Sequence, residues 1–499
     1  MYRFFFLLIL NLITKGFCFI EPNESLDSDQ AIVLIMGNRI LQGIDFPIFF
    51  YGLRYLAPIE LYITIPFFAL FGLKYSVMLC VEILLSTMNS YLLFLLLRNK
   101  NIHWAMLSSV LFSIGNEYLN SLLVDISANY NLTLSFVLIG AFLLPKEKED
   151  NIKKLFLVGL LIGLGLYMRE LTVFYLGLLP ILWFLSLTVK RNILVIPIGF
   201  FIGYLPAILF PIIVPYSNKL IKVIPKLETD FNKLIKVVPD ILAKIYLPTD
   251  TNHYFTNLVL LIITFIGISI FYFSIYFSLT SKKSSINFYF NESLFYYLTI
   301  GTILNLSFVL ITKEALVYRY YIGTMIFYTL GISGFLILLY EKKRTIFYFL
   351  FIVYVGLVLN STYRTYKQRL DRLDSGIKSI KEVLIQENKT SGFSEYWANY
   401  PLTFLTNEKI YSMTYLDRQR DILGAIHVLE NGVDFYLFIK DSNFEKNFLA
   451  THSLNDYSKI EKGKYSLYLC KKKEFPWGEN TQSILEELKT FTKYGLKFN

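Results

Sequence analysis

The chain has 499 residues, of which 55% are hydrophobic, 17% aromatic and only 17% charged. This composition excludes an ordinary soluble globular protein, which carries more charge and fewer apolar residues. The formal net charge of +10 comes from Lys and Arg gathered in short loops between apolar runs. It therefore indicates membrane topology and argues against a nucleic acid partner.

Cysteine and histidine are too dispersed to predict a structural framework. The three cysteines lie far apart, and the four histidines show none of the short spacings that metal ligands normally have. We therefore predict neither a disulfide network nor a metal site built on these residues, which are Cys18, Cys80, Cys470, His103, His253, His427 and His452.

Apolar windows of about 20 residues recur along the first 360 residues, and each could cross about 30 Å of hydrocarbon as a helix. The first run, MYRFFFLLIL, lacks a small-residue cleavage site and is expected to be an uncleaved span. With Arg3 cytoplasmic, every expected cytoplasmic turn is basic. The sequence predicts a polytopic α-helical membrane protein with about eleven spans, near 4–20, 75–97, 104–119, 132–144, 155–168, 172–190, 193–214, 255–279, 294–311, 320–340 and 346–359.

Two external segments interrupt this transmembrane module, which is expected to cover 1–360. The first external loop, 21–74, carries several charges among aromatic residues and prolines. The second, 216–254, has apolar residues at mixed three- and four-residue intervals, which predicts an amphipathic helix lying on the membrane surface. Such a segment is expected to act as a lid or interfacial element.

The composition becomes mixed and polar after Asn360, and we expect a small C-terminal α/β domain over 361–499. GIKSIKEVLIQEN has helical periodicity, while KIYSMTY, DFYLFIK and KYSLYLCKK have the character of short strands. Counting eleven spans places this domain outside the cytoplasm, on the same side as the first external loop.

Acidic residues of the first external loop are the first candidates for chemistry. Asp27 and Asp29 precede the short amphipathic segment AIVLIMGNRIL. They could be solvated residues, with Asp29 capping the next helix. Alternatively, one of them could act as a general base at the membrane boundary. Glu60 is the second acidic candidate in this stretch, and Tyr51 is a further candidate site residue.

Charged residues at the outer ends of spans form a second set of candidates. A charge within the hydrocarbon costs about 2.5 to 3.5 kcal/mol, so such residues usually pair or face a cavity. Arg169 and Arg319 could hold a lipid phosphate; alternatively, Arg169 and Glu170 form an interfacial pair and Arg319 snorkels. Glu117 and Asp125 flank an outer turn, and either a functional or a merely solvated role suits them.

The run DSDQAIVLIMGNRILQGIDFPIFFYGLRYLAPIELYITIPFFALFG resembles the first external loop of bacterial GT-C membrane glycosyltransferases. These include family 39, the lipid A aminoarabinose transferase and the protein O-mannosyltransferases. The phrases SDQA, FPIFFYG and PIELY match in order and spacing. Further likenesses are GLLIGLGLYMRELTVFYLGLLP, GFFIGYLPAILF, YRYY and SEYWANYPLTFLTNEKIYSMTY. Gln30 stands where relatives usually have Glu, and Arg169 and Glu170 stand where they usually have uncharged or small residues.

This resemblance implies an inverting glycosyltransferase of the bacterial cytoplasmic membrane that glycosylates a component of the cell envelope. Its donor would be a polyprenyl-phosphate sugar, used on the external face, with membrane lipids as further partners. By resemblance, Asp29 is the general base on the acceptor hydroxyl, and the acceptor could be a lipid, a glycan or a protein. No cofactor is firmly implied, and the question of a divalent metal stays open.

Two other functions are compatible with an apolar chain of this kind. A transporter or lipid flippase would use charges near the middle of the membrane and would show inverted repeats, neither of which is clear in this sequence. A catalytically degenerate GT-C-like scaffold is the second alternative, because Gln30 departs from the usual acidic residue.

Overall fold

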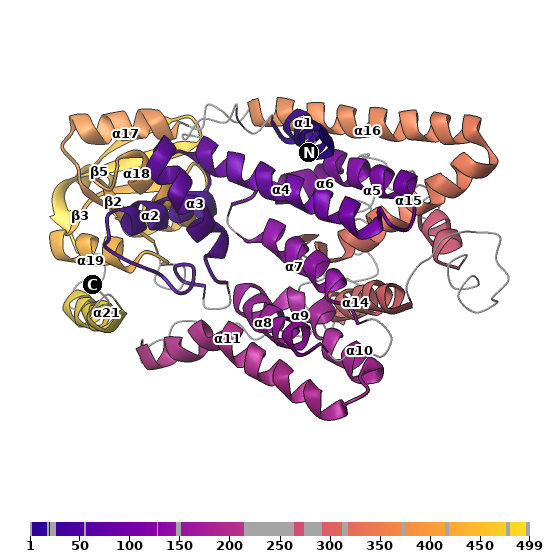
Figure 1. Ribbon diagram of the computed structural model, residues 1–499. Coiled ribbons are helices and arrows are strands. Elements are labelled where there is room, and N and C mark those ends of the chain that lie inside the picture. Colours follow the sequence, from indigo (N-terminus) through magenta and orange to yellow (C-terminus); the bar gives the residue numbers. More distant parts are fainter. Residues whose placement is uncertain are drawn as a thin grey trace. The chain divides into compact units, whose positions relative to one another are not determined.

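The computed structural model describes most of the chain as two compact units of helices and strands (Figure 1). Unit 1 comprises Met1–Cys18, Cys80–Pro206 and Val223–Tyr366, and unit 2 comprises Phe19–Leu79, Ala207–Lys222 and Lys367–Asn499. The expected external loop 216–254 lies outside the described residues. Those described are 2–16, 19, 26–53, 56–126, 128–145, 151–213, 264–273, 292–311, 318–370, 376–414, 419–475 and 480–495.

Unit 1 is built from helices. A helix lies in or overlaps each of the eleven segments expected to span the membrane. The labelled helices are α1 (Tyr2–Lys15), α4 (Tyr75–Leu97), α5 (Ile102–Ile114), α6 (Glu117–Leu123), α7 (Tyr130–Phe142), α8 (Ile152–Met168), η3 (Glu170–Thr172), α9 (Val173–Leu176), α10 (Leu179–Ser186), η4 (Lys190–Leu194), α11 (Val195–Ile213), α14 (Glu292–Ile311), η7 (Tyr318–Tyr321), α15 (Thr324–Lys342) and α16 (Arg344–Leu370).

Four helices among the described residues are long and apolar enough to cross a membrane by length and composition. They are Tyr75–Leu97, Lys190–Phe210, Thr324–Lys342 and Arg344–Arg364. Shorter apolar helices occupy several other expected spans. The protein is therefore a polytopic integral membrane protein, whereas the total of eleven spans stays a prediction.

Three expected spans differ in extent from the helices that occupy them. The segment 104–119 is interrupted, because α5 ends at Ile114 and α6 begins at Glu117. The segment 172–190 is not one helix, because α9 ends at Leu176 and α10 begins with Pro180 in its first turn. Proline lacks an N–H and its ring clashes with the preceding turn, so the helix breaks before it. Conversely, α16 continues to Leu370, because the polar segment that follows its apolar part still favours a helix in water.

Glycines bring α8 and α11 into unusually close contact. A Cβ at Gly159 would lie 2.0 Å from the carbonyl oxygen of Ile196, and one at Gly199 would lie 2.3 Å from that of Phe156. Only glycine permits two backbones to approach so closely, as in the small-residue interfaces common between membrane helices. These residues therefore fix the crossing of the two helices.

Unit 2 combines two helices of the first external loop with an α/β layer. Its helices are α2 (Ser28–Leu41), α3 (Ile59–Phe71), α17 (Ile377–Gln386), α18 (Tyr396–Leu405), α19 (Ile422–Asn431), α20 (Asn443–Thr451), η9 (Leu454–Asp456) and α21 (Thr481–Gly495). Its strands are β1 (Ser391–Ser394), β2 (Tyr411–Met413), β3 (Val433–Ile439), β4 (Tyr457–Lys462) and β5 (Tyr465–Glu474). Helix α2 packs against α3 and α18.

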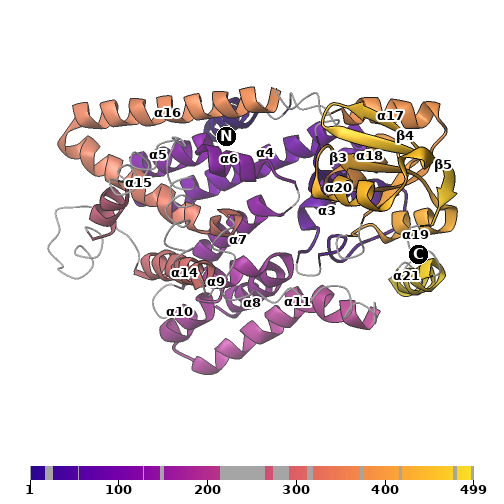
Figure 2. The ribbon, with the colours of Figure 1, turned by 180° about the vertical axis from the view of Figure 1, so that it is seen from behind.

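The five strands form one mixed sheet in the order β2-β1-β3-β5-β4. Strand β1 runs parallel to β2 and β3, whereas β5 runs antiparallel to β3 and β4. Strands β2, β3 and β5 lie where the sequence predicts short strands. Figure 2 shows the sheet from behind, with α20 lying against its strands.

Apolar residues cover both faces of the sheet. Along β3, Phe435 and Leu437 join a core with α17 and α18, while Tyr436 and Phe438 join another with α19 and α20. This alternation follows from the two-residue period of a strand. Because helices cover both faces, the central strand is apolar from Phe435 to Ile439, and the position of α18 beside the sheet is fixed.

Candidate active site

Asp27 caps α2, the first helix of the segment 21–74. Its side chain accepts a hydrogen bond from the backbone N–H of Gln30, and the Gln30 side chain accepts one from the backbone N–H of Asp27. This reciprocal pair is a capping box, which satisfies two donors at the helix start. The alternative in which Asp29 caps α2 is therefore wrong. Gln30 serves the cap and also donates to the Tyr75 hydroxyl at 3.3 Å.

Asp29 lies in the first turn of α2 and contacts two residues from the C-terminal part of unit 2. The guanidinium of Arg420 pairs with it, with 2.8 Å between Nη1 and Oδ1. The hydroxyl of Tyr396, at the start of α18, donates a hydrogen bond to the same oxygen. The side chain of Asp29 remains 23% exposed and that of Arg420 20% exposed. Asp29 is therefore both fixed and open to solvent.

Arg420 is held by its own surroundings. Its guanidinium carbon lies 5.2 Å from the centre of the Tyr396 ring, a cation–π contact. Its backbone N–H donates to the Tyr400 hydroxyl oxygen at 2.6 Å. Gly52, the last residue of the FPIFFYG phrase, has φ +71°, and a Cβ there would lie 2.7 Å from Cγ of Arg420. Gly52 thus leaves the space that the Arg420 side chain fills.

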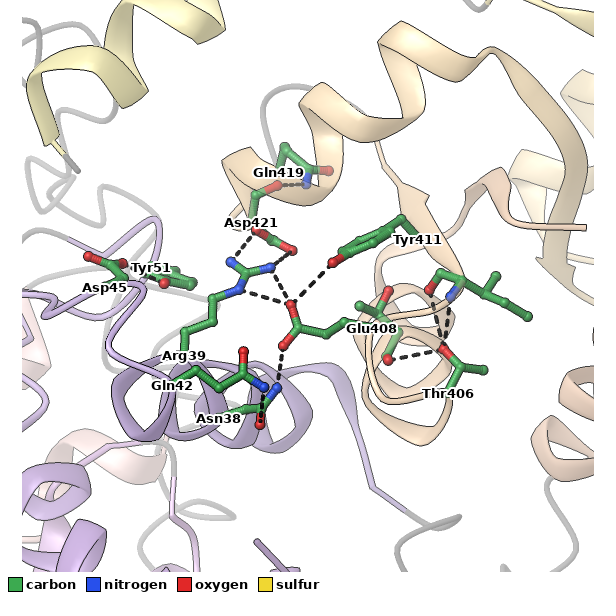
Figure 3. Close-up of polar contacts among 12 residues, drawn as sticks. Asn38, Arg39, Gln42, Asp45, Tyr51, Thr406, Glu408, Tyr411, Gln419 and Asp421 are labelled. Atoms are coloured by element: carbon green, nitrogen blue, oxygen red, sulfur yellow. Dashed lines mark hydrogen bonds and ion pairs between the residues drawn. The ribbon is translucent and has the colours of Figure 1, made fainter. Parts of the chain in front are cut away.

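A buried ion cluster around Arg39 joins α2 to the residue next to Arg420 (Figure 3). Arg39 is 2% exposed and makes a two-point pair with Asp421, at 2.8 and 3.0 Å. It also pairs with Glu408 at 2.9 Å, while Asn38 donates to the other Glu408 oxygen at 2.7 Å. Burial is the largest effect and lowers the pKa of Arg39, but the attraction and hydrogen bonds of Asp421, together with Tyr51 and Glu408, outweigh it, so the pKa is raised.

Tyr51 supports the Arg39 cluster. The Arg39 guanidinium carbon lies 5.7 Å from the centre of the Tyr51 ring, and the Tyr51 hydroxyl donates a hydrogen bond to Asp45 at 2.5 Å. Burial raises the pKa of both Tyr51 and Asp45, because it penalises the charged forms. Glu60, the other acidic candidate of this loop, is fully buried in the first turn of α3. Tyr51 therefore supports the Arg39 cluster by packing. Of the two acidic candidates, Asp29 is more exposed than Glu60.

Unit 1 holds a second cluster, centred on Arg169 at the end of α8. Arg169 is 5% exposed, donates from Nη1 to the carbonyl oxygen of Ala128 and lies over the Tyr130 ring at 4.5 Å. Its Nε has no hydrogen-bond acceptor among the described residues. A buried guanidinium with an unused donor is a candidate site for an anionic oxygen.

The structure brings further sequence candidates of unit 1 close to Arg169. Glu170 and Arg319 interact electrostatically with Arg169, and Asp125 and Arg319 with Tyr130. Arg319 is exposed on η7, whereas Glu170 and Asp125 are half-buried. The side chain of Glu117 lies outside the described residues. Four candidates from three separate stretches of the sequence thus form one charged cluster in unit 1.

Arg420, Tyr396 and the ion pairs of Arg39 were not predicted from the sequence. Tyr396, Tyr400 and Glu408 belong to the quoted phrase SEYWANYPLTFLTNEKIY, which offered a signal. Arg420 lies in the charged string DRQRD, which has no distinguishing pattern. Among the described residues, no group of three or more His, Cys, Asp or Glu side chains could hold a metal ion.

Comparison with known proteins shows one clear structural likeness. No protein-family model and no curated protein sequence matches the chain. The crystal structure of ArnT from Cupriavidus metallidurans bound to undecaprenyl phosphate has a TM-score of 0.55 at 10% identity, covering 94% of this chain and 97% of that one. The apo state of ArnT has a TM-score of 0.55 at 9% identity, covering 89% and 93%. ArnT is the lipid A aminoarabinose transferase, and this chain shares its GT-C fold.

Proposed function

We propose that this protein is an inverting membrane glycosyltransferase that uses a polyprenyl-phosphate sugar as its donor. The observation that carries the proposal is the fold likeness over nearly the whole chain to an enzyme that binds undecaprenyl phosphate. The partly exposed carboxylate of Asp29, held by Arg420 and Tyr396, supports it. The acceptor could be a lipid, a glycan or a protein of the cell envelope.

Asp29 is the proposed general base. The acceptor hydroxyl oxygen attacks the anomeric carbon of the donor sugar from the side opposite the phosphate. The bond between that carbon and the phosphate oxygen breaks, and its electron pair leaves with the polyprenyl phosphate. The hydroxyl proton passes to the Asp29 carboxylate. A single displacement of this kind inverts the anomeric carbon, and general-base help contributes about 10²- to 10⁴-fold in rate.

Arg169 and Arg319 are the proposed ligands of the donor phosphate. Arg guanidinium groups bind phosphate by paired hydrogen bonds and stabilise the charge that develops on a leaving phosphate. The unused Nε of Arg169 and the exposed position of Arg319 support this role. The half-buried Asp125 and Glu170 would limit the anions that the cluster accepts, because they repel negative charge.

Asp29 and the C-terminal α/β domain are proposed to face the exterior of a bacterial cytoplasmic membrane. This orientation follows from the basic cytoplasmic turns of the sequence. A reporter fused after Asn499 tests it, because the fusion should be active outside the cytoplasm. A reporter active only in the cytoplasm would refute this topology.

Purified protein in lipid vesicles, offered a panel of polyprenyl-phosphate sugars, tests the activity. Asp29→Asn should lower kcat at least about 100-fold, because an amide cannot take the proton. Asp27→Asn is the matched control, because asparagine caps a helix as well as aspartate does. Full activity of Asp29→Asn would refute the assignment of the base. Lipid movement across the vesicle without sugar transfer would favour a transporter or flippase.

A further inference from the structure

The two contacts of Asp29 fall on one of its two carboxylate oxygens. Nη1 of Arg420 lies 2.8 Å from Oδ1, and the Tyr396 hydroxyl donates to Oδ1 as well. Among the described residues, Oδ2 accepts no hydrogen bond. An oxygen that already accepts one hydrogen bond and lies 2.8 Å from a guanidinium nitrogen has less capacity to take a further proton. The carboxylate is therefore asymmetric, and Oδ2 is its more available oxygen.

The Arg420 side chain has little freedom to leave this position. It lies over the Tyr396 ring and fills the space above Gly52. The backbone N–H of Arg420 itself donates a hydrogen bond to the Tyr400 hydroxyl. The next residue, Asp421, is fixed by the buried Arg39 pair. An arginine confined in this way loses little further conformational entropy when it pairs. Its position is thus set by the fold and not by Asp29 alone.

We propose that Arg420 is a positioning residue that, together with Tyr396, holds Oδ1 of Asp29 so that Oδ2 takes the acceptor proton. This inference rests on the proposed function. In the transfer step, the proton moves from the acceptor oxygen to Oδ2 as the new glycosidic bond forms and the bond to phosphate breaks. Arg420 and Tyr396 touch neither substrate and act through the direction in which they hold the carboxylate.

The proposal predicts a specific pattern in the kinetics. Arg420→Ala should lower kcat roughly 30-fold with little change in the KM for the donor, because a misdirected base costs rate and not donor binding. Arg420→Lys should recover at least a third of the lost rate, because an ammonium can still reach Oδ1. Tyr396→Phe should cost less, because it keeps the ring under Arg420 and removes one hydrogen bond.

A double-mutant cycle isolates action through Asp29. In the Asp29→Asn background, the Arg420→Ala change should lower the residual kcat less than about 2-fold, because there is no longer a base to direct. An equal fall in both backgrounds would refute the proposal. Lys440→Ala is the matched control, since it removes a basic residue from an exposed ion pair of the same unit, 2.6 Å from Glu461. It should leave kcat unchanged.

A double-mutant cycle of thermal stability tests the contact between Asp29 and Arg420 without requiring enzymatic turnover. The thermal midpoint shifts of Asp29→Asn and Arg420→Ala should not add in the double variant, because both changes remove the same contact. Additive shifts would overturn the inference even if the wild type transfers sugar. Conversely, absence of transfer from every donor, with non-additive shifts, would refute the proposed function and support the Asp29–Arg420 contact. The two failures are therefore distinguishable.

Discussion

Arg39 and Asp421 are 382 positions apart in the chain and yet form a two-point ion pair, with 2.8 Å between Nη1 and Oδ1 and 3.0 Å between Nη2 and Oδ2. The pair is buried, and Asp421 immediately follows Arg420. A change in the buried pair should therefore alter both the stability of unit 2 and the position of the Arg420 side chain.

Asp421→Asn should destabilise the protein by about 3 kcal/mol. Removing one partner of a buried pair leaves the other charge with less compensation, and among the described residues Arg39 would retain only its ion pair with Glu408. Chemical unfolding monitored by tryptophan fluorescence measures the change. Glu461→Gln is the control, because its ion pairs are exposed and should contribute little to stability. Equal losses in the two variants would contradict the buried anchor.

Gly52→Ala should lower transfer activity more than Gly43→Ala does. Both glycines have positive φ, +71° and +69°, so each substitution costs about 1 to 2 kcal/mol of backbone strain. Only at position 52 would the new methyl group meet Arg420, because a Cβ at Gly43 has nothing within 4 Å. The measured quantity is kcat for each variant. Matching kcat values would argue against the packing of Gly52 on Arg420.

Asp27→Ala should cost about 1 kcal/mol of stability, because it removes the N-cap of α2. Asp27→Ser should restore most of this loss, since serine is also a good cap. Thermal unfolding of the three proteins gives the comparison. If Asp27→Ser is no more stable than Asp27→Ala, the capping box does not stabilise α2.

Arg319→Ala should raise the KM for the lipid-linked donor while leaving the thermal midpoint nearly unchanged. Arg319 is exposed on η7, and its proposed partner is the donor phosphate. Arg169→Ala should raise the donor KM and also lower the thermal midpoint, because Arg169 is buried over Tyr130. Donor titrations and thermal unfolding separate the two effects. An unchanged donor KM in both variants would exclude the proposed phosphate site.

The stability of the C-terminal layer should fall as the pH drops below about 6.5, partly through His427. Burial lowers the pKa of His427 from its ordinary value of 6.5, and Lys473 adds to this effect while Glu430 opposes it. Below 6.5 the unfolded chain takes up the proton more readily than the folded one, so protonation favours unfolding. His427→Gln should show a smaller fall in thermal midpoint between pH 7.5 and 5. An identical pH dependence would rule out this contribution.

The helical membrane character of the protein could be predicted from the sequence because the apolar runs are long and the basic turns are regular. Pro180 could also have predicted the break between α9 and α10, but the surrounding residues are all apolar and favoured one continuous span. Strands β2, β3 and β5 were recognisable, whereas β1, Ser391–Ser394, was not. Its small residues have no strand preference of their own, and their pairing with β2 and β3 places them in the sheet.

The candidate site could be predicted only in part. Asp29 was recognisable from the phrase around it, but its partner Arg420 lies in a segment with four charges among five residues and no pattern. Side-chain pairing between distant segments depends on the packing of α2 against α18, which no local periodicity encodes. For the same reason the capping role went to the wrong aspartate, since Asp27 and Asp29 are equally good caps by residue type.

The separation of the Arg39 and Asp421 segments also bears on how the chain is made. A ribosome adds about 5 to 20 residues per second, so roughly 20 to 80 s pass between synthesis of Arg39 and of Asp421. Throughout that interval, the nascent α2 carries a guanidinium whose acidic partners have not yet been translated. It must remain hydrated or shielded by a chaperone or by lipid headgroups until the last quarter of the chain emerges. Truncation before Asp421 would therefore be expected to trap an unfinished protein that quality-control proteases can remove.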